Sequence, residues 1–339
     1  MSARSISPLR EAAAKLAAII PRERLDAAVR AWADSASRRT RWAVALSGGA
    51  DSLALLLLIW AHWPERRRTL RALHFDHRLR GSESRGDARY CARVCRELDL
   101  ELVRGTWRGK NHGASEATAR AARMAFFEKY GRTIWLGHQQ DDIAESMLMR
   151  LARGSGAAGL AAPRPVQALP GGRVHVRPLL GLKRAEIEAA LRAAGVSWRT
   201  DSSNEFDEHF RNRVRRRVVP AWVHAAQRDA VAGAARSRAL LEEDDAALEA
   251  WVDSLWPTSA ARRVLPLASL AGKPRALWRR ALHRWLRAQP RAGELSSAAF
   301  ESLLAAIQRG PTRQSAGVRG FVVSDGSEVR FQSVRKYRR

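Results

Sequence analysis

Residues 47–52 read Ser-Gly-Gly-Ala-Asp-Ser, and they stand between two apolar stretches at residues 42–46 and 53–61. The first stretch has the length of a buried strand and the second that of a helix, so the six residues predict a tight strand-to-helix turn. Glycine allows the backbone conformations of such a turn, and the N–H groups that begin the helix face an anion there. Ser47 and Ser52 add two hydroxyl donors. The stretch therefore predicts an anion-binding turn.

Asp51 lies within this turn, where a carboxylate repels a phosphate unless a cation lies between them. The residue therefore predicts an Mg²⁺ ion that joins Asp51 to a pyrophosphate group. The turn lacks the lysine of the G-x-x-x-x-G-K-[ST] loop, which excludes the ordinary phosphate loop of kinases and GTPases. The alternative is a turn in which Asp51 or a serine only caps the helix.

Strand and helix patterns alternate on both sides of the turn. Strands are predicted at residues 42–46, 70–76, 101–106, 133–137 and 173–176. Helices are predicted at residues 51–62, 83–98, 114–130, 141–153 and 183–194. This alternation is typical of an α/β fold with a doubly wound, mostly parallel sheet, in which ligands bind at the carboxyl ends of the strands. Residues 154–172, rich in Gly, Ala and Pro, predict a long loop over that edge.

Two domains are predicted. The first covers residues 1–220 and begins with a helical extension that Pro21 interrupts. The second, residues 221–339, is predicted to be mainly helical and to end in a β-hairpin around residues 324–327.

The chain is strongly basic, because 60 Lys and Arg against 34 Asp and Glu give a net charge of +26 over 339 residues. Such a charge favours a polyanionic partner such as a nucleic acid; the alternative is arginine used wherever lysine would serve. The two cysteines, Cys91 and Cys95, are too few for a disulfide framework or a four-cysteine metal site. Without an apolar stretch of membrane-spanning length or a recognisable secretory signal, we expect no membrane association and a cytoplasmic location.

The motif at residues 47–52 resembles the pyrophosphate-binding loop of the N-type ATP pyrophosphatases, the PP-loop superfamily, which cleave ATP between its α and β phosphates. Further motifs, in the same order along residues 43–220, are similar to those of the tRNA(Ile)-lysidine synthetases within that superfamily. They are His74-Phe75-Asp76-His77-Arg78-Leu79-Arg80, Ala119-Arg120 with Arg123, residues 137–146, Arg153-Gly154-Ser155-Gly156 with Gly159-Leu160, Arg177-Pro178-Leu179-Leu180, Asp201-Ser202-Ser203-Asn204, and Arg211-Asn212-Arg213-Val214-Arg215.

The resemblance implies an adenine nucleotide alpha hydrolase-like fold and a ligase that forms a carbon–nitrogen bond, with ATP and Mg²⁺ as cofactors. ATP would adenylate the C2 carbonyl oxygen of the wobble cytidine, position 34, in tRNA(Ile) with a CAU anticodon, releasing PPi. The ε-amine of L-lysine would then attack C2 and expel AMP. The helical second domain would contact the tRNA, and a homodimer is possible.

The resemblance also assigns roles to residues. It implies that ATP is bound by Ser47, Gly48, Gly49, Ala50, Asp51, Ser52, His74, Asp76, His138, Arg153 and Gly154. It assigns lysine to Asp141, Asp142 and Glu145, catalysis to Asp51, Arg120, Asp142 and Glu145, and the metal to Asp51.

The acids at residues 141–145 also stand out without the resemblance. Asp142 and Glu145 are three residues apart and share one face of the predicted helix. They can bind Mg²⁺ or the ammonium group of lysine, or, as the alternative, only complement the helix dipole. A carboxylate here can orient the amine or accept its proton.

Five arginines crowd into residues 211–217: Arg211, Arg213, Arg215, Arg216 and Arg217. They predict an RNA-binding segment that contacts phosphates, in which some members pair with Asp201, Glu205 or Asp207. A solvated basic helix is the alternative.

The sequence departs from the family pattern at Gln139, where a second histidine is usual, at Ile143 and at Arg78. Two rival functions remain: a tRNA thiolase of the same fold, and a non-catalytic RNA-binding relative. A thiolase normally needs a CxxC pair, whereas Cys91 and Cys95 are four residues apart.

Overall fold

The computed structural model describes residues 7–76, 82–107, 116–199, 210–256, 264–289, 293, 295–316 and 320–333. The chain divides into two compact units, Met1–Glu242 and Glu243–Arg339. The division falls inside one long helix, α11 (Ala230–Leu255), and not near residue 220 as the sequence predicts. Because the helix runs through the division, no change of composition in the sequence marks it.

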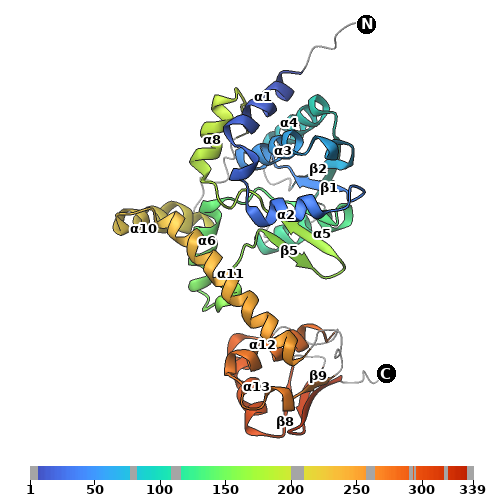
Figure 1. Ribbon diagram of the computed structural model, residues 1–339, viewed down its shortest axis with the longest axis vertical. Coiled ribbons are helices and arrows are strands. Elements are labelled where there is room, and N and C mark those ends of the chain that lie inside the picture. Colours follow the sequence, from blue (N-terminus) through green and yellow to red (C-terminus); the bar gives the residue numbers. More distant parts are fainter. Residues whose placement is uncertain are drawn as a thin grey trace. The chain divides into compact units, whose positions relative to one another are not determined.

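The first unit is built on a six-stranded sheet with the order β3-β2-β1-β4-β6-β5. Figure 1 labels β1, β2 and β5 of this sheet. β1 pairs in parallel with β2 on one side and with β4 on the other, and β5 runs antiparallel to β6. The strands are β1 (Trp42–Ala45), β2 (Leu70–Asp76), β3 (Glu101–Thr106), β4 (Thr133–Trp135), β5 (Val166–Leu169) and β6 (Arg173–Val176). The predicted mostly parallel α/β fold is confirmed.

Helices cover both faces of this sheet. They are α1 (Pro8–Ile19), α2 (Ala27–Ser35), α3 (Ala50–His62), α4 (Ser82–Leu98), α5 (Glu116–Tyr130), α6 (Gln140–Leu151), α7 (Ala157–Leu160) and α8 (Arg184–Ala193). They are followed by α9 (Phe210–Arg213), a π-helical turn (Val214–Val218), α10 (Val219–Ala226) and the start of α11. No helix in the described part of the chain combines the length and the hydrophobicity that a membrane span requires.

The alternation of side chains along β1 separates the two layers of the core. Trp42 and Val44 pack in the cluster that α3, α4 and α8 complete, whereas Ala43 packs with Phe127 of α5 on the opposite face. The rings of Trp42 and Trp135 pack in a tilted arrangement with their centroids 4.6 Å apart, which joins the central strands β1 and β4 on the first face.

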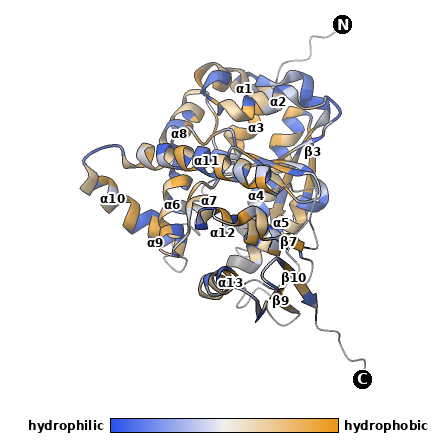
Figure 2. Ribbon diagram, turned by 60° about the horizontal axis from the view of Figure 1, so that its bottom comes forward, coloured by the Kyte–Doolittle hydropathy of each residue, from blue (hydrophilic) through white to orange (hydrophobic). Residues whose placement is uncertain are grey.

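Helix α3 is buried on all its sides. Residues 52–60 are all buried, because α1 and α8 pack over the helix that already lies on the sheet. Figure 2 shows the resulting apolar colour along α3. Truncating a buried leucine such as Leu56 to alanine costs about 2–5 kcal/mol, so α3 is a rigid support for the turn before it.

The predicted long loop at residues 154–172 is not a plain loop. It contains the short helix α7 and the strand β5, which pairs with β6 from Val166↔Val176 to Leu169↔Arg173. The strand carries no regular apolar alternation, since Gln167 and Ala168 sit between Val166 and Leu169, and the sequence pattern therefore missed it.

The second unit combines helices with a four-stranded antiparallel sheet of order β7-β10-β9-β8. Its elements after α11 are β7 (Val264–Pro266), α12 (Arg275–Arg287), α13 (Ser297–Arg309), β8 (Thr312–Ser315), β9 (Gly320–Ser324) and β10 (Glu328–Ser333). The turn predicted at residues 324–327 joins β9 to β10. The sequence pattern does not reveal β7, which has three residues, or β8, which is polar.

Candidate active site

The turn at residues 47–52 joins β1 to α3 and is held by its own serines. The Ser52 hydroxyl accepts from the Ser47 backbone N–H at 3.1 Å and donates to the Gly49 carbonyl at 3.0 Å. The two serine hydroxyls lie 2.9 Å apart, and Gly48 has a φ of +96°, which favours glycine. From outside the turn, the Arg199 N–H donates to the Gly48 carbonyl at 3.0 Å. The turn is therefore fixed before any ligand arrives.

Gly137, directly after β4, fits closely against the start of α3. A Cβ atom on Gly137 would lie 2.9 Å from the Asp51 carbonyl oxygen and 3.1 Å from the Ser52 nitrogen. Only glycine allows this approach, which brings the segment with the predicted acids close to Asp51. The motif contained Gly137, but nothing in the sequence showed this packing role.

Asp51 itself lies in an unusual environment. Burial, followed by the nearby charge of Asp142, raises the pKa of its carboxyl group to about 7. Its Oδ1 atom is buried, and no described residue donates a hydrogen bond to it. A cation beside this oxygen would stabilise the ionised form, so the site fits Mg²⁺.

In the part of the chain that the structure describes, Asp51 does not belong to a larger cluster of metal-ligating side chains. The described residues contain no group of three or more His, Cys, Asp or Glu side chains that could hold a metal ion. Mg²⁺ in proteins is commonly held by one or two carboxylates together with substrate phosphates and water. The geometry therefore suits a metal that arrives with a phosphate ligand.

His74 and Asp76 lie at the carboxyl end of β2, beside a pocket of about 640 Å³. The His74 Nδ1–H donates to the Leu46 carbonyl at 2.9 Å, and its Nε2 is buried without a partner among the described residues. Sequence reasoning missed the three arginines that also line this pocket, Arg85, Arg89 and Arg104. The motif residues from His77 to Arg80 lie outside the described residues.

The predicted acids begin helix α6, and Gln139 caps it. The Gln139 side-chain oxygen accepts from the Asp141 and Asp142 N–H groups, while the Asp142 carboxylate accepts from the Gln139 N–H at 3.1 Å. The departure from the usual second histidine therefore has a structural use here, as a capping box. Ile143, the other described departure, is buried.

The three acids do not all face the same way. Asp142 and Glu145 are buried, with exposed fractions of 7% and 2%. Asp141 instead accepts from the Arg184 N–H at the start of α8, at 2.9 Å. The structure therefore groups Asp142 and Glu145 as an acidic pair and turns the Asp141 carboxylate toward α8.

Two arginines from the predicted RNA-binding segment contact the acidic pair. The Arg211 guanidinium donates to Asp142 at 2.6 Å and to Glu145 at 2.8 Å. The Arg215 Nε–H donates to the second oxygen of Glu145 at 2.5 Å. These are charge-assisted bonds between buried carboxylates and partly buried guanidinium groups. Removing one partner of a fully buried pair typically costs about 3–5 kcal/mol, which is an upper bound here.

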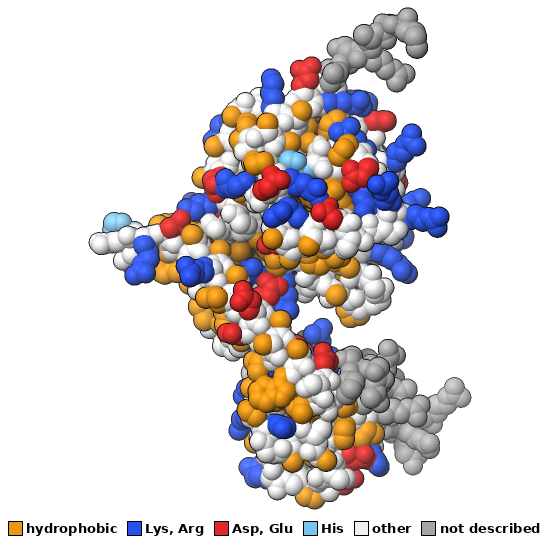
Figure 3. Space-filling model, viewed as in Figure 1, with side chains coloured by type: hydrophobic (Ala, Val, Ile, Leu, Met, Phe, Trp, Pro, Cys, Tyr) orange, Lys and Arg blue, Asp and Glu red, His pale blue; other side chains and the backbone are white. Residues whose placement is uncertain are grey.

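The same segment carries its other arginines outward. Arg213, Arg216 and Arg217 are exposed, whereas Arg211 and Arg215, four residues apart, share the inward face. The predicted pairing partners Asp201, Glu205 and Asp207 lie outside the described residues. RNA binding by Arg211 and Arg215 is therefore not what their positions favour, while for the exposed three it stays a prediction. Figure 3 shows Lys and Arg side chains spread over the visible face of the first unit, with Asp and Glu among them.

His138 lies beside a group of arginines. Its Nδ1 accepts from the Arg177 Nε–H at 3.3 Å, which requires an unprotonated Nδ1. Burial, then the charges of Arg177, Arg211, Arg120 and Arg123, hold the His138 pKa well below its usual range. Burial and the charge of Arg120 likewise lower the pKa of Arg177 to about 10. The predicted Arg120 and His138 therefore belong to one electropositive region with Arg177.

Arg153 and Gly154 lie at the opposite end of α6 from the acids. Both follow the last residue of α6, about 18 Å along the helix axis from its first turn, and Arg153 is exposed. Gly154 has a φ of +70°, as a turn after a helix requires. The length of α6 therefore separates these two residues from the acids at its start.

The cysteines are buried in the α4 layer of the core. Burial, then for Cys91 the charge of Cys95, raises the pKa of both thiols, that of Cys95 to about 12. Thiols held protonated and covered are poor metal ligands and poor nucleophiles. This observation disfavours thiolase chemistry.

Comparison with known proteins gives a consistent picture. A family model described as the PP-loop domain matches residues 21–222. The tRNA(Ile)-lysidine synthase of Symbiobacterium thermophilum is 40% identical over 211 residues, covering 60% of this chain and 44% of that protein. That of Geobacter sulfurreducens is 38% identical, covering 71% and 53%. That of Gloeobacter violaceus is 37% identical, covering 72% and 75%.

The chain thus spans about half the length of the first two of these curated relatives. Among solved structures, the U34-tRNA thiolase of Methanococcus maripaludis with its [4Fe-4S] cluster is similar in fold. The TM-score is 0.50 at 16% identity, covering 69% of this chain and 79% of that one.

Proposed function

The chain belongs to the PP-loop family and, within it, to the tRNA(Ile)-lysidine synthases, and we propose that it ligates L-lysine to a tRNA at the expense of ATP. In this proposal the substrate is tRNA(Ile) with a CAU anticodon, and the new carbon–nitrogen bond forms at C2 of the wobble cytidine, position 34. The single observation that carries the proposal is the closeness of Asp51, in the anion-binding turn, to Asp142 of the buried acidic pair.

The turn is proposed to bind the phosphates of ATP. The PP-loop domain implies ATP binding, and the N–H groups at the start of α3, which no side chain caps among the described residues, supply donors for a pyrophosphate group. The Ser47 and Ser52 hydroxyls, which bond within the turn, hold these groups in place. Asp51 would hold Mg²⁺, which neutralises charge on the phosphates when bound. The electropositive region of Arg120, His138 and Arg177 supports the same negative charge from another side.

The first step is adenylation of the cytidine. The C2 carbonyl oxygen attacks the α-phosphate of ATP, the bond between the α and β phosphates breaks, and PPi leaves. The cytidine must leave its stack to be reached, as base-modifying enzymes require. The pocket beside His74, with Arg85, Arg89 and Arg104, offers donors for phosphate or base groups near the turn.

The second step uses the acidic pair. The lysine ε-ammonium would bind Asp142 and Glu145, lose a proton to a carboxylate, and attack C2, so that AMP leaves with the C2 oxygen. The guanidinium groups of Arg211 and Arg215 occupy these carboxylates in the structure. Because they are cations like the ammonium group, lysine can replace one of them without leaving the acids unpaired.

The testing experiment is incorporation of labelled lysine into a tRNA(Ile) transcript with a CAU anticodon, with and without ATP. Transcripts of tRNA(Met), which has the same anticodon, are the control. We expect ATP-dependent labelling of tRNA(Ile) alone. Release of PPi without labelling would mean another nucleophile, and neither product would favour a non-catalytic RNA-binding protein.

A cytoplasmic location and a homodimer also belong to the proposal. Sedimentation of the purified protein at several concentrations tests the dimer, and fractionation of the producing cells tests the location.

A further inference from the structure

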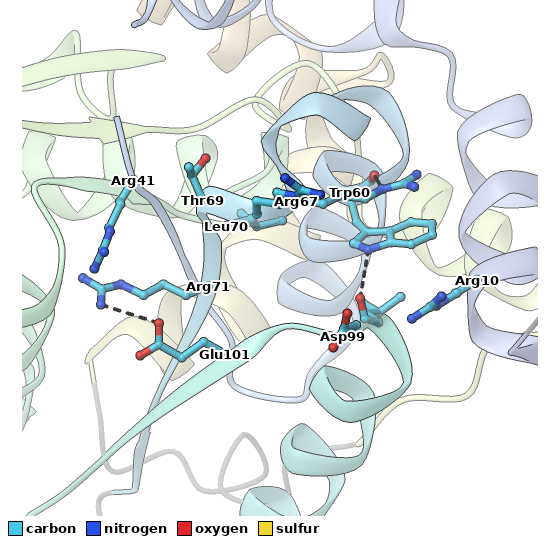
Figure 4. A pocket seen from close by; sticks show the side chains of 11 residues that line it. Arg10, Arg41, Trp60, Arg67, Thr69, Leu70, Arg71, Asp99 and Glu101 are labelled. Atoms are coloured by element: carbon cyan, nitrogen blue, oxygen red, sulfur yellow. Dashed lines mark hydrogen bonds and ion pairs between the residues drawn. The ribbon is translucent and has the colours of Figure 1, made fainter. Parts of the chain in front are cut away.

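A second pocket lies at the opposite edge of the sheet from the anion-binding turn. It is formed by residues at the amino ends of β1, β2 and β3, by α1 and by the turn that follows α3, and its volume is about 410 Å³ (Figure 4). The turn at residues 47–52 and the acidic pair lie at the carboxyl ends of the strands. The pocket is therefore separate from the site proposed above.

Arginines dominate the described lining of this pocket: Arg10, Arg41, Arg67, Arg68 and Arg71. The acids in the same lining are Asp99 and Glu101, and the Arg71 guanidinium is 4.0 Å from the Glu101 carboxylate. The pocket lining thus holds five guanidinium groups and two carboxylates. At the acidic pair, by contrast, Arg211 and Arg215 make short charge-assisted bonds to carboxylates.

Two of these arginines are fixed by the protein before a ligand binds. The Arg67 Nε–H donates to the Trp60 carbonyl at 2.9 Å, and its guanidinium stacks on the Trp60 ring at 3.6 Å. The Arg10 Nε–H donates to the Glu97 carbonyl at 2.9 Å. Burial, then the charge of Arg10, lowers the pKa of Arg67, as expected when cations crowd together. Such preorganised donors lose little entropy when they bind an anion.

Arg71 adds a donor that no acceptor in the described part of the chain uses. Its Nε atom is buried, and no described residue accepts a hydrogen bond from it. In Figure 4 the guanidinium ends of Arg41 and Arg71 point toward one another across the pocket. Two like charges in this arrangement are stabilised by an anion between them.

We propose that this pocket binds phosphate groups. Arginine presents planar pairs of N–H donors that match phosphate oxygens, and the pocket places several such donors around one concave space. The phosphates can belong to the backbone of an RNA or to a free polyphosphate anion, and both have the chemistry that the lining recognises. The site does not depend on the proposed ligase reaction; only the use of tRNA as the RNA probe rests on it.

The test compares two double substitutions of exposed arginines with the same change of charge. Arg41→Gln with Arg68→Gln removes two cations of the pocket, and Arg38→Gln with Arg39→Gln removes two neighbouring cations that do not line it. Thermal unfolding of each variant checks that the fold is retained. Binding of tRNA is measured over a series of salt concentrations, and binding of inorganic tripolyphosphate is measured by calorimetry.

If RNA phosphates occupy the pocket, the Arg41/Arg68 variant binds tRNA about tenfold more weakly, and the slope of log Kd against log salt falls by about 1–2, unlike the Arg38/Arg39 variant. If a free polyphosphate occupies it, the Arg41/Arg68 variant instead loses one tripolyphosphate binding event that the other variant keeps. Equal behaviour of the two variants in both measurements overturns the proposal. Lysine incorporation at saturating tRNA reports separately on the proposed function, and we expect it to be unchanged in both variants.

Discussion

Both edges of the parallel sheet gather arginines, but they differ in the acids that face them. At the carboxyl edge, Arg211 and Arg215 meet Asp142 and Glu145 at 2.5–2.8 Å. At the amino edge, the nearest acid contact of Arg71 is 4.0 Å long. The residue type is the same, but its charge is compensated at one edge and largely uncompensated at the other.

This difference shows that the bonding partners of an arginine, and not its charge alone, decide which kind of ligand its site can bind. A guanidinium bonded to two buried carboxylates holds the acids in place, and a ligand that reaches those acids must be a cation. A guanidinium held by carbonyl groups and an aromatic ring keeps donors for an anion. The two edges therefore predict opposite ligand preferences: a cation beside the acidic pair and a phosphate in the arginine pocket.

The largest effect is expected from Asp51→Asn. Without the carboxylate the proposed Mg²⁺ site is lost, so PPi release should fall about a thousandfold or more while tRNA still binds. Asp99→Asn is the matched control at the amino edge, because Asp99 is exposed and has a φ of +57°, which asparagine tolerates. Full PPi release by the Asp51 variant would contradict the assignment of the turn.

Glu145→Gln should reduce lysine incorporation about a hundredfold but leave PPi release largely intact, because the acids serve the second step. The change also removes the Glu145 charge from its bonds with Arg211 and Arg215, although Arg211 keeps its bond to Asp142, and we expect the free energy of unfolding to fall by about 3 kcal/mol. Incorporation, PPi release and urea denaturation measure the three quantities.

Glu101→Gln at the amino edge is the control for Glu145, since among the described residues that exposed acid makes only the long contact with Arg71. It should leave lysine incorporation, PPi release and the free energy of unfolding nearly unchanged. An unchanged lysine KM in the Glu145 variant would remove the acidic pair from lysine binding.

The sequence was sufficient for most of the first unit because its elements have strong patterns. The buried strand before residue 47 and the uninterrupted apolar helix after it are visible in the residues alone. Strands such as β5 and β8 were missed because they have mixed or polar composition and gain their stability from pairing with neighbours. The unit division was misplaced because a continuous helix spans it.

For the candidate site, the sequence predicted which residues belong to the site but not which side chains contact one another. Asp51 was predicted from its place in the turn, and Asp142 and Glu145 from their spacing on one helix face and from the resemblance. The structure places Asp142 close enough to Asp51 to raise its pKa, and it buries Asp142 together with Glu145. The pairing of Arg211 and Arg215 with the acids was not predicted, because it depends on two segments about 70 residues apart in sequence. The role of Gly137 was likewise invisible until its neighbour was known.

The arginine segment allows a direct test of inward against outward groups. Arg216→Gln with Arg217→Gln removes exposed cations, so tRNA binding should weaken several-fold and its salt slope should fall by about 1–2. Arg211→Gln with Arg215→Gln removes the same charge from the inward face and should change lysine KM and stability instead. Equal salt slopes for the two variants would show that the inward and outward positions do not divide these roles.

The smallest effect is expected at His175, a buried basic side chain that makes no hydrogen bond to a carboxylate among the described residues. Burial, then the charge of Arg177, lowers the pKa of His175 to about 4 from an ordinary 6.5. Between pH 6.5 and pH 4 the unfolded chain therefore binds a proton at His175 that the folded chain does not bind. The contribution of His175 to the free energy of unfolding is complete above pH 6.5 and is lost as the pH falls toward 4, by at most about 3 kcal/mol. His175→Gln should flatten this fall in urea denaturation at several pH values, whereas His224→Gln, an exposed histidine, should not. Parallel pH curves for wild type and the His175 variant would mean that burial of this ring carries no proton linkage.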